Sequence, residues 1–186
     1  MPVDELGVFA QPVPNLQKDV KLNQLSEICP RERMHAMPQN NQTSGSVSPE
    51  LDAMTCDVIG AFLDSLAEGE DPGVVVCVED ANGARYEAVF TDDGEEACLS
   101  AANDFVAQHA AHGIPNEDVK RIERYAIACT GCVDIDGAYA NAVLVSFYER
   151  GLESGYSAYV LFDGMGEGDN FMWSDPEPAG EEPAIF

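Results

Sequence analysis

Three β-rich runs follow one another with links too short to hold a helix, and this feature constrains the fold most. The runs cover residues 121–134, 139–148 and 156–162. Ile135-Asp136-Gly137 separates the first two, and a segment containing Gly151 and Gly155 separates the last two. Parallel strands need a crossover of roughly a dozen residues, whereas antiparallel strands can be joined by a tight turn. The sequence therefore predicts an antiparallel meander over these runs.

An earlier pair of β-rich runs flanks the dipeptide Asn82-Gly83. The runs read GVVVCVED and ARYEAVFT. Asn-Gly between two such runs is typical of a type I′ hairpin turn, which needs positive φ at both central residues. We therefore predict a hairpin over residues 73–91, with Asn82 and Gly83 at the centre of its turn.

Two stretches carry the signals of amphipathic helices. In the first, Ser48 is suited to cap the helix, Pro49 fits the first helical position, and Gly69 ends the pattern. Its apolar residues recur at helical spacing: Leu51, Met54, Val58, Ile59, Phe62 and Leu66. The second runs from about residue 92 to Gly113. Its first turn holds acidic residues that suit the positive end of a helix dipole: Asp92, Asp93, Glu95 and Glu96.

These elements predict an α+β fold in the order α-β-β-α-β-β-β, with an antiparallel sheet of about five strands and two helices packed on one face. We expect a single compact domain over residues 48–165. Residues 1–47, which are rich in Pro, Gln and Asn, are predicted to form a flexible arm or linker in which 16–29 could form a short helix. That arm could also be a docking segment that orders on a partner. Residues 166–186 are predicted to be an acidic, irregular tail.

The charge of the chain is strongly negative. It has 34 Asp and Glu against 9 Lys and Arg, a formal net charge of −25, of which residues 1–35 carry only −1. Such a field repels phosphate and anionic lipid and attracts basic surfaces and cations. We therefore predict that the partner is a basic protein surface, and we do not expect the chain to bind nucleic acid. Acidity that serves only solubility is the simpler alternative.

No membrane or export segment is visible in the sequence. The longest apolar run spans only Val74 to Val78, and a bilayer needs roughly 18 or more apolar residues. The first residues are acidic, where a signal peptide would be basic. We therefore expect a soluble cytoplasmic protein that is not bound to a membrane.

Two short motifs could bind a metal. Cys129-Thr-Gly-Cys132 and His109-Ala-Ala-His112 together supply four residue types that ligate zinc. On a regular strand, however, residues three apart point to opposite faces, so the cysteines converge only if the strand breaks between them. The simpler interpretation is that the cysteines are small strand residues, with Cys129 buried, and that the histidines lie on a helix face and at a helix end. No cofactor is predicted, and zinc is the alternative.

One loop resembles a calcium site only in part. Asp134-Ile-Asp136-Gly137 has its glycine at the fourth position instead of the sixth position of a calcium loop, which favours a hairpin turn. Trp173 lies among acids and apolar residues near the C-terminus, where it could dock on a partner or fold back over the sheet edge. The candidate partner-binding residues are Asp92, Asp93, Glu95, Glu96, Asp169 and Trp173.

These observations favour a non-enzymatic interaction or inhibitor protein that presents a negative surface to a basic partner. Inhibitors that occupy a nucleic-acid site on another protein, and immunity-type proteins that neutralise a basic toxin, both present a negative surface to a basic partner. The alternative is a small metal- or thiol-dependent enzyme, or a zinc-binding domain, that uses Cys129 and Cys132 with His109 and His112.

Overall fold

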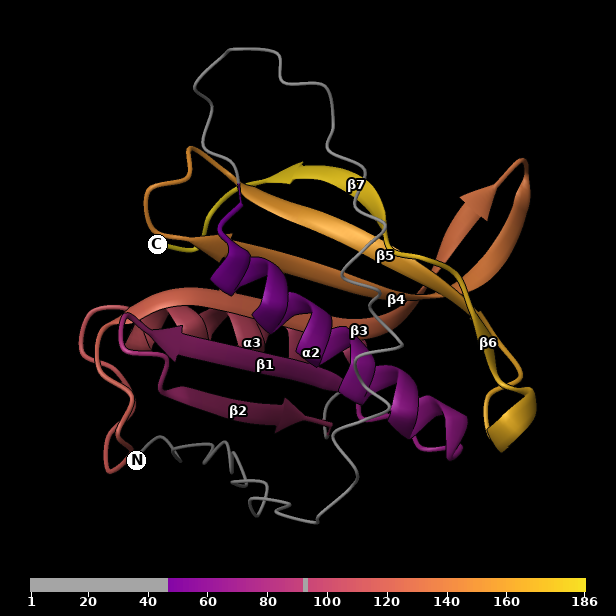
Figure 1. The fold of residues 1–186 in the computed structure, drawn as a ribbon, viewed down its shortest axis with the longest axis horizontal. Helices are drawn as coiled ribbons and strands as arrows, with labels where there is room; N and C mark the ends of the chain where they lie inside the picture. The colour runs from indigo at the N-terminus through magenta and orange to yellow at the C-terminus, as the bar shows by residue number, and fades with distance from the viewer. Residues whose placement is uncertain (1–46, 92–93) are drawn as a thin grey trace, which may run out of the picture.

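The structure, a computed structural model, describes residues 47–91 and 94–186, and in them two α-helices accompany one antiparallel sheet (Figure 1). The elements are α2 (Pro49–Ala67), β1 (Val74–Asp80), β2 (Arg85–Phe90), α3 (Glu95–His109), β3 (Ile122–Ile135), β4 (Ala138–Glu149), β5 (Gly155–Asp163), the 3-10 helix η1 (Gly168–Asn170), β6 (Met172–Trp173) and β7 (Glu177–Glu182). The α+β class and the predicted order α-β-β-α-β-β-β are confirmed, and the sheet gains β6 and β7. Residues 1–46, with the predicted helix 16–29, and residues 92–93 lie outside the described residues.

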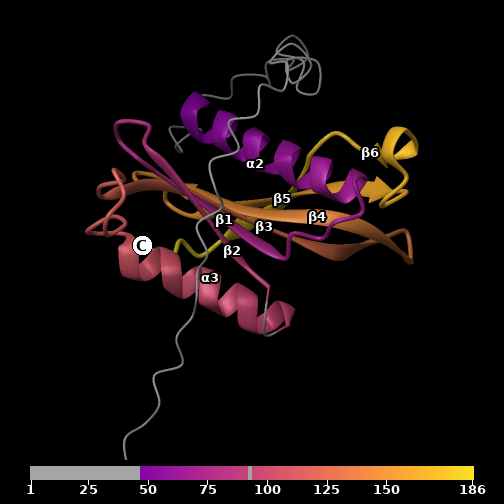
Figure 2. The same ribbon diagram turned by 90° about the horizontal axis from the view of Figure 1, so that it is seen from below.

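The two helices lie on opposite faces of the sheet. Figure 2 shows α2 above the sheet and α3 below it. The strands run in the order β2-β1-β3-β4-β5-β6, with α2 packed on β3 and β4, and α3 on β1, β2 and β3. Consecutive residues from Tyr125 to Cys129 are all buried, as a strand covered on both faces requires. The prediction that both helices cover one face is therefore wrong, because the apolar runs in β1 and β3 are continuous and do not alternate.

The start of α2 is fixed by Ser48, as predicted. Its hydroxyl oxygen accepts a hydrogen bond from the backbone N–H of Leu51 at 3.0 Å. The same hydroxyl donates to Glu149 Oε2 at 2.6 Å, and the Ser48 N–H donates to Glu149 Oε1 at 2.8 Å. The cap therefore satisfies a free helix N–H and also ties α2 to the end of β4.

The β1–β2 hairpin forms, but its turn is not of type I′. Gly83 has φ 82°, whereas Asn82 is not at positive φ. The carboxylate of Asp80 accepts hydrogen bonds from the N–H groups of Asn82 and Ala84, at 2.8 and 3.1 Å, and so holds a wider loop. Burial raises the pKa of Asp80, but N–H donors, including that of Lys120, outweigh burial and hold the pKa below its ordinary value.

The predicted turn between β3 and β4 is a hairpin turn, and it has the positive φ angles expected of type I′. Ile135 pairs with Ala138, and the two residues between them, Asp136 and Gly137, have φ 54° and 85°. The side chain of Asp134 accepts a hydrogen bond from the Gly137 N–H at 2.7 Å. The two aspartates of this motif therefore form part of the turn: Asp134 accepts a hydrogen bond within it, and Asp136 is one of its central residues.

The C-terminal segment adds two strands to the outer edge of β5, so the prediction of an irregular tail over 166–186 is wrong. β6 pairs Trp173 with Phe162, and β7 pairs with β5 from Gly155 to Tyr159. Aromatic rings anchor this segment. Phe171 is buried against Phe162, and the ring of Phe186 lies 5.5 Å from Tyr125 and 5.4 Å from Tyr148.

The helices of the described residues do not include one that is long and apolar enough to cross a membrane.

Candidate functional site

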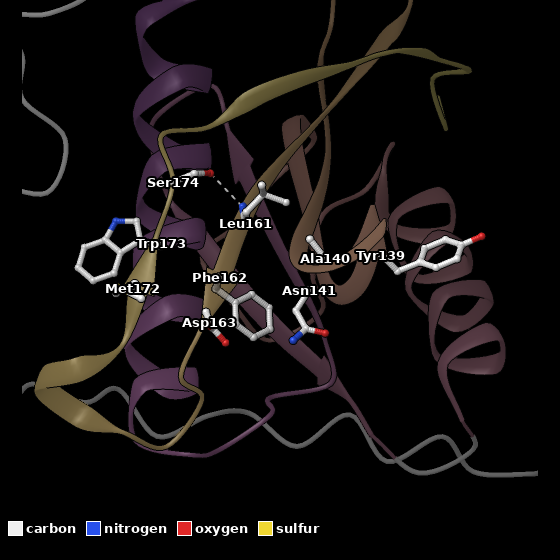
Figure 3. A pocket seen from close by; sticks show the side chains of 9 residues that line it. All are labelled: Tyr139, Ala140, Asn141, Leu161, Phe162, Asp163, Met172, Trp173 and Ser174. Carbon is white, nitrogen blue, oxygen red and sulfur yellow. Dashed lines mark hydrogen bonds between the residues drawn. The ribbon is translucent and has the colours of Figure 1, made fainter. Parts of the chain in front are cut away.

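A hollow of about 510 Å³ opens where β4 and β5 separate. The two strands are paired as far as Ala142 and Leu161, while the β3–β4 hairpin continues to Ile135 and Ala138. β5 continues along its other edge with β6. The hollow between the diverging strands is shown in Figure 3, and its lining residues are Tyr139, Ala140, Asn141, Leu161, Phe162, Asp163, Met172, Trp173 and Ser174.

Large apolar side chains are exposed around this hollow. Tyr139 is 81% exposed, Met172 62% and Trp173 47%. Most monomeric proteins keep such side chains scattered, and a group of them with polar surroundings is typical of an interaction surface. Trp173 is held in place by Phe171, because the two rings stack with centroids 5.9 Å apart. Trp173 therefore folds onto the sheet edge and still presents much of its ring to solvent.

Acidic side chains surround the hollow on each segment that forms it. Asp163 lies in the hollow itself, between Phe162 and the β5–β6 loop. The other exposed acids belong to the β3–β4 turn, to the β5–β6 loop and to the residue that follows Ser174: Asp134, Asp136, Glu167, Asp169 and Asp175. The aromatic surface is thus placed within a negative field, which favours a positively charged ligand.

Two arginines near α2 are used inside the protein. Glu79 is only 4% exposed, and its carboxylate accepts hydrogen bonds from Arg85 and Arg124. Arg85 also pairs with Asp57 at 2.6 Å, and Arg124 Nε lies 3.6 Å from Glu149. These guanidinium groups neutralise buried or nearby carboxylates, and they do not offset the charge of the acidic surface.

Arg150 is also engaged internally. It donates to the backbone oxygens of Ile122 at 2.8 Å and Ala110 at 2.9 Å, and its guanidinium lies 4.2 Å from the centroid of the Phe186 ring. The two other Lys or Arg side chains of the described residues, Lys120 and Arg121, are exposed and belong to the segment before β3.

The CxxC motif does not bring its cysteines together. β3 is continuous from Ile122 to Ile135, so Cys129 and Cys132 point to opposite faces of the sheet. Cys129 is buried, whereas Cys132 is exposed with its sulfur 4.0 Å from Asn141 Oδ1. Thr130, on the same face as Cys132, donates to Asp71 at 3.0 Å. The strand therefore has no break at Thr130-Gly131.

The histidines occupy the positions that the simpler interpretation predicts. His109 Nδ1 lies 2.8 Å from the backbone oxygen of Phe105, and the two rings lie 4.5 Å apart on one face of α3. His112 is exposed beyond the end of α3. Among residues 47–91 and 94–186, no group of three or more His, Cys, Asp and Glu side chains is arranged to hold a metal ion. Within the described residues, the CxxC and HxxH motifs therefore do not form a shared metal site.

The predicted partner-binding residues lie in two places. Glu95 and Glu96 are exposed in the first turn of α3, and Asp92 and Asp93 lie outside the described residues. Asp169 is part of η1, next to β6 and Trp173. Figure 2 shows α3 below the sheet and β6 level with α2 above it. Only Asp169 and Trp173 therefore belong to the surface around the hollow.

Sequence reasoning missed Tyr139, Asn141 and Phe162. Each lies in a run that was recognised only as a strand. β4 separates from β5 because the β3–β4 ladder continues beyond the end of the β4–β5 ladder. The local sequence does not indicate where either ladder ends. An aromatic residue two positions after an Asp-Gly turn, as Tyr139 is, was the one available indication, because the tip of a hairpin is exposed.

Comparison with known proteins adds no relative, since no protein-family model, no curated protein and no solved structure matches the chain. The geometry defines only a class: an α+β protein whose sheet carries an exposed aromatic hollow within an acidic surface.

The two cysteines of the CxxC motif are expected to differ in reactivity. Burial first, and then the charges of Glu95 and Asp71, raise the pKa of Cys129 to about 11. At pH 8 only about one thiol in a thousand would then be ionised, and the thiolate is the reactive form. Iodoacetamide at pH 8 should therefore label Cys132 in the native protein, as peptide mapping by mass spectrometry would report. Labelling of Cys129 should rise only as the pH approaches 11.

Cys77 is the matched negative control, because burial raises its pKa to about 12. Labelling of Cys129 at the rate of Cys132 at pH 8 would contradict the continuous, buried strand described above.

Proposed function

We propose that this chain is a non-enzymatic interaction protein that presents a negative surface to a basic partner, in the manner of an inhibitor that occupies a nucleic-acid site or of an immunity-type protein. The observation that carries the proposal is the exposed aromatic hollow placed among acids. Tyr139, Met172 and Trp173 supply apolar anchors, and aromatic residues provide much of the binding energy of protein interfaces.

The charge distribution supports the same proposal. From residue 36 onward the chain has 29 Asp and Glu against five Lys and Arg. Three of those five, Arg85, Arg124 and Arg150, make internal contacts. The remaining acids act together at the surface, and such a field steers a basic partner toward it and repels nucleic acid.

The proposal predicts saturable, salt-dependent binding of a basic probe. A peptide of about 15 residues made of Lys, Arg, Ser and Gly should bind the full chain at low salt in calorimetric titrations. We expect saturation near one peptide per chain and a Kd that rises at least about tenfold as salt screens the charges. An acidic peptide of the same length and a DNA duplex are the controls, and neither should bind.

Two results would overturn the proposal. One is the absence of binding at low salt. The other is titration that continues to many peptides per chain, which is the behaviour of a general polyanion whose acidity serves solubility alone.

A further inference from the structure

β2 is the outermost strand of the sheet at the end opposite β6, and within the described residues no strand pairs with its outer edge (Figure 1). The Asp80 N–H donates to the Ala84 oxygen at 3.0 Å, so these two residues form the first hydrogen-bonded pair of the β1–β2 hairpin. Hydrogen-bonded and non-hydrogen-bonded pairs alternate along antiparallel strands. The backbone groups of Tyr86, Ala88 and Phe90 therefore point toward β1.

The alternate residues of β2 direct their backbone N–H and C=O groups away from the sheet: Arg85, Glu87 and Val89. Such groups at a sheet edge can pair with an extended segment of another chain, which adds a strand to the sheet. β2 has no proline, and its pairing with β1 has no register shift, so neither a proline nor a bulge blocks this edge. A second copy of the chain is disfavoured there, because each copy has a formal net charge of −25.

Acidic side chains lie on the α2 side of this edge. Asp57, Ala61 and Asp64 follow one another at helical spacing, so they share one stripe of α2. Asp57 pairs with Arg85 at 2.6 Å, which places this stripe next to β2. Asp64 and Glu87 line the same cavity beside α2. Ala61 is small and exposed, and it leaves room beside Asp64 for a long side chain from another molecule.

These acids are not neutralised by the chain itself. Asp64, Glu68 and Glu87 form no ion pair with a Lys or Arg of the described residues. Arg85, the basic residue of β2, is engaged by Glu79 and by the helix. Burial first, and then the charge of Glu68, raise the pKa of Asp64. A cation from a partner would reduce this repulsion, so the edge is complementary in charge to a basic segment.

We propose that β2 pairs with an extended segment of the basic partner, which adds an antiparallel strand to the sheet and directs lysine or arginine side chains toward Asp64 and Glu87. All strand pairs of the sheet are antiparallel, and this pairing is slightly more stable than the parallel one. Directly opposite residues have side chains on the same face. Partner residues that bond to Glu87 and Val89 therefore point their side chains to the α2 side.

This inference rests on the proposed function and adds to it a mode of backbone recognition. The lining of the cavity beside α2 continues to Trp173, which also lines the hollow. A segment of about 15 residues is about 50 Å long when extended, so one segment can contact both surfaces.

Backbone methylation of a probe peptide tests the pairing without changing the protein. The probe is a short capped peptide in which lysine and threonine alternate. One derivative has N-methyl groups on the lysine amides, and the other has an equal number on the threonine amides, so their charges are the same. Lysines that face α2 use their amides to bond to β2. We therefore expect the lysine-methylated peptide to bind at least about tenfold more weakly in calorimetric titrations at low salt.

Hydrogen exchange followed by NMR locates the binding residue by residue. In the free chain, the amides of Glu87 and Val89 should exchange rapidly, whereas those of Ala88 and Phe90 are protected by β1. Saturation with the unmethylated peptide should slow exchange at Glu87 and Val89 at least about tenfold, as new backbone hydrogen bonds would.

A pair of matched variants tests the charge at this edge. Glu87→Gln should weaken binding of the unmethylated peptide about fourfold, and Glu153→Gln less than about twofold. Glu153 is an exposed acid in the loop between β4 and β5, and its replacement removes the same charge. Both glutamates are exposed, so neither replacement should impair folding.

Equal affinity of the two methylated peptides, or unchanged exchange at Glu87 and Val89 in the complex, would overturn the pairing at β2 and leave the proposed function standing. Equal weakening by Glu87→Gln and Glu153→Gln would do the same. Slow exchange at Glu87 and Val89 in a peptide-free chain that sediments as a dimer would assign the edge to a second copy. If no basic peptide binds at low salt, the proposed function fails together with the inference.

Discussion

Replacing Gly113 by alanine is expected to lower the free energy of unfolding by about 4 kcal/mol. Gly113 is buried with φ 74°, where a side chain costs about 1–2 kcal/mol. An added Cβ would lie 2.2 Å from the backbone oxygen of Val119 and 2.4 Å from that of Lys120. Because these are backbone atoms, relief requires the α3–β3 loop to move, which adds about 1–3 kcal/mol. Urea unfolding followed by circular dichroism would measure the loss.

Gly137 provides the matched control. It also has a positive φ, 85°, but an added Cβ would have nothing within 4 Å. Gly137→Ala should therefore cost only the conformational part, about 1–2 kcal/mol. Equal losses for the two variants would contradict the close approach of the Val119 and Lys120 backbone to Gly113.

Gly113 also shows which features the sequence could predict. It ends the pattern of the second helix, and in the structure its N–H donates to the His109 oxygen at 2.8 Å as the chain leaves α3. Ser48 as the cap of α2 and the turn at Asp136-Gly137 are signals of the same kind. Each depends on the conformation of a few neighbouring residues, which local sequence determines.

The features that sequence could not predict depend on distant residues. β7 consists of polar, Gly- and Pro-containing sequence, and β6 has only two residues. They become strands because β5 offers an open edge, because Phe171 is buried against Phe162 and because the ring of Phe186 packs on Tyr125. Pro178 is tolerated there because β7 is an edge strand. The position of α3 also depends on distant residues. The apolar runs of β1 and β3 need cover on both faces of the sheet, and α3 covers the face opposite α2.

The candidate site was predicted in part. Trp173 and Asp169 were singled out because aromatic and acidic residues are adjacent in the sequence near the C-terminus. The hollow could not be predicted, because it exists only where the β3–β4 ladder extends beyond the β4–β5 ladder. The pairing register, which the sequence does not reveal, determines that difference in length. The use of arginines inside the protein likewise depends on register, because Glu79 faces Arg124 across one pair of strands and Arg85 across another.

That pairing leads to a second large effect, at Glu79. Replacing Glu79 by glutamine is expected to lower the free energy of unfolding by about 3 kcal/mol. The carboxylate accepts from Arg85 and from Arg124, and the side chain of Arg124 is only 11% exposed. Loss of one partner of a buried pair leaves an uncompensated buried charge, which typically costs about 3–5 kcal/mol. Glu149, 3.6 Å from Arg124 Nε, offsets part of this cost, which sets the value at the lower end. The urea midpoint of the variant would measure it.

Asp57→Asn removes a charge from the same network and is the control that separates burial from charge. Asp57 pairs with Arg85 at 2.6 Å, but its side chain is 66% exposed, so solvent screens the pair. An exposed pair of this kind contributes at most about 1 kcal/mol, and salt should reduce even that. The loss caused by Glu79→Gln should instead persist at high salt, because water and ions do not reach the buried carboxylate. If the two variants lose equal stability, or if salt abolishes the effect of Glu79→Gln, then the network is a surface feature and does not hold β1, β2 and β3 together beneath α2.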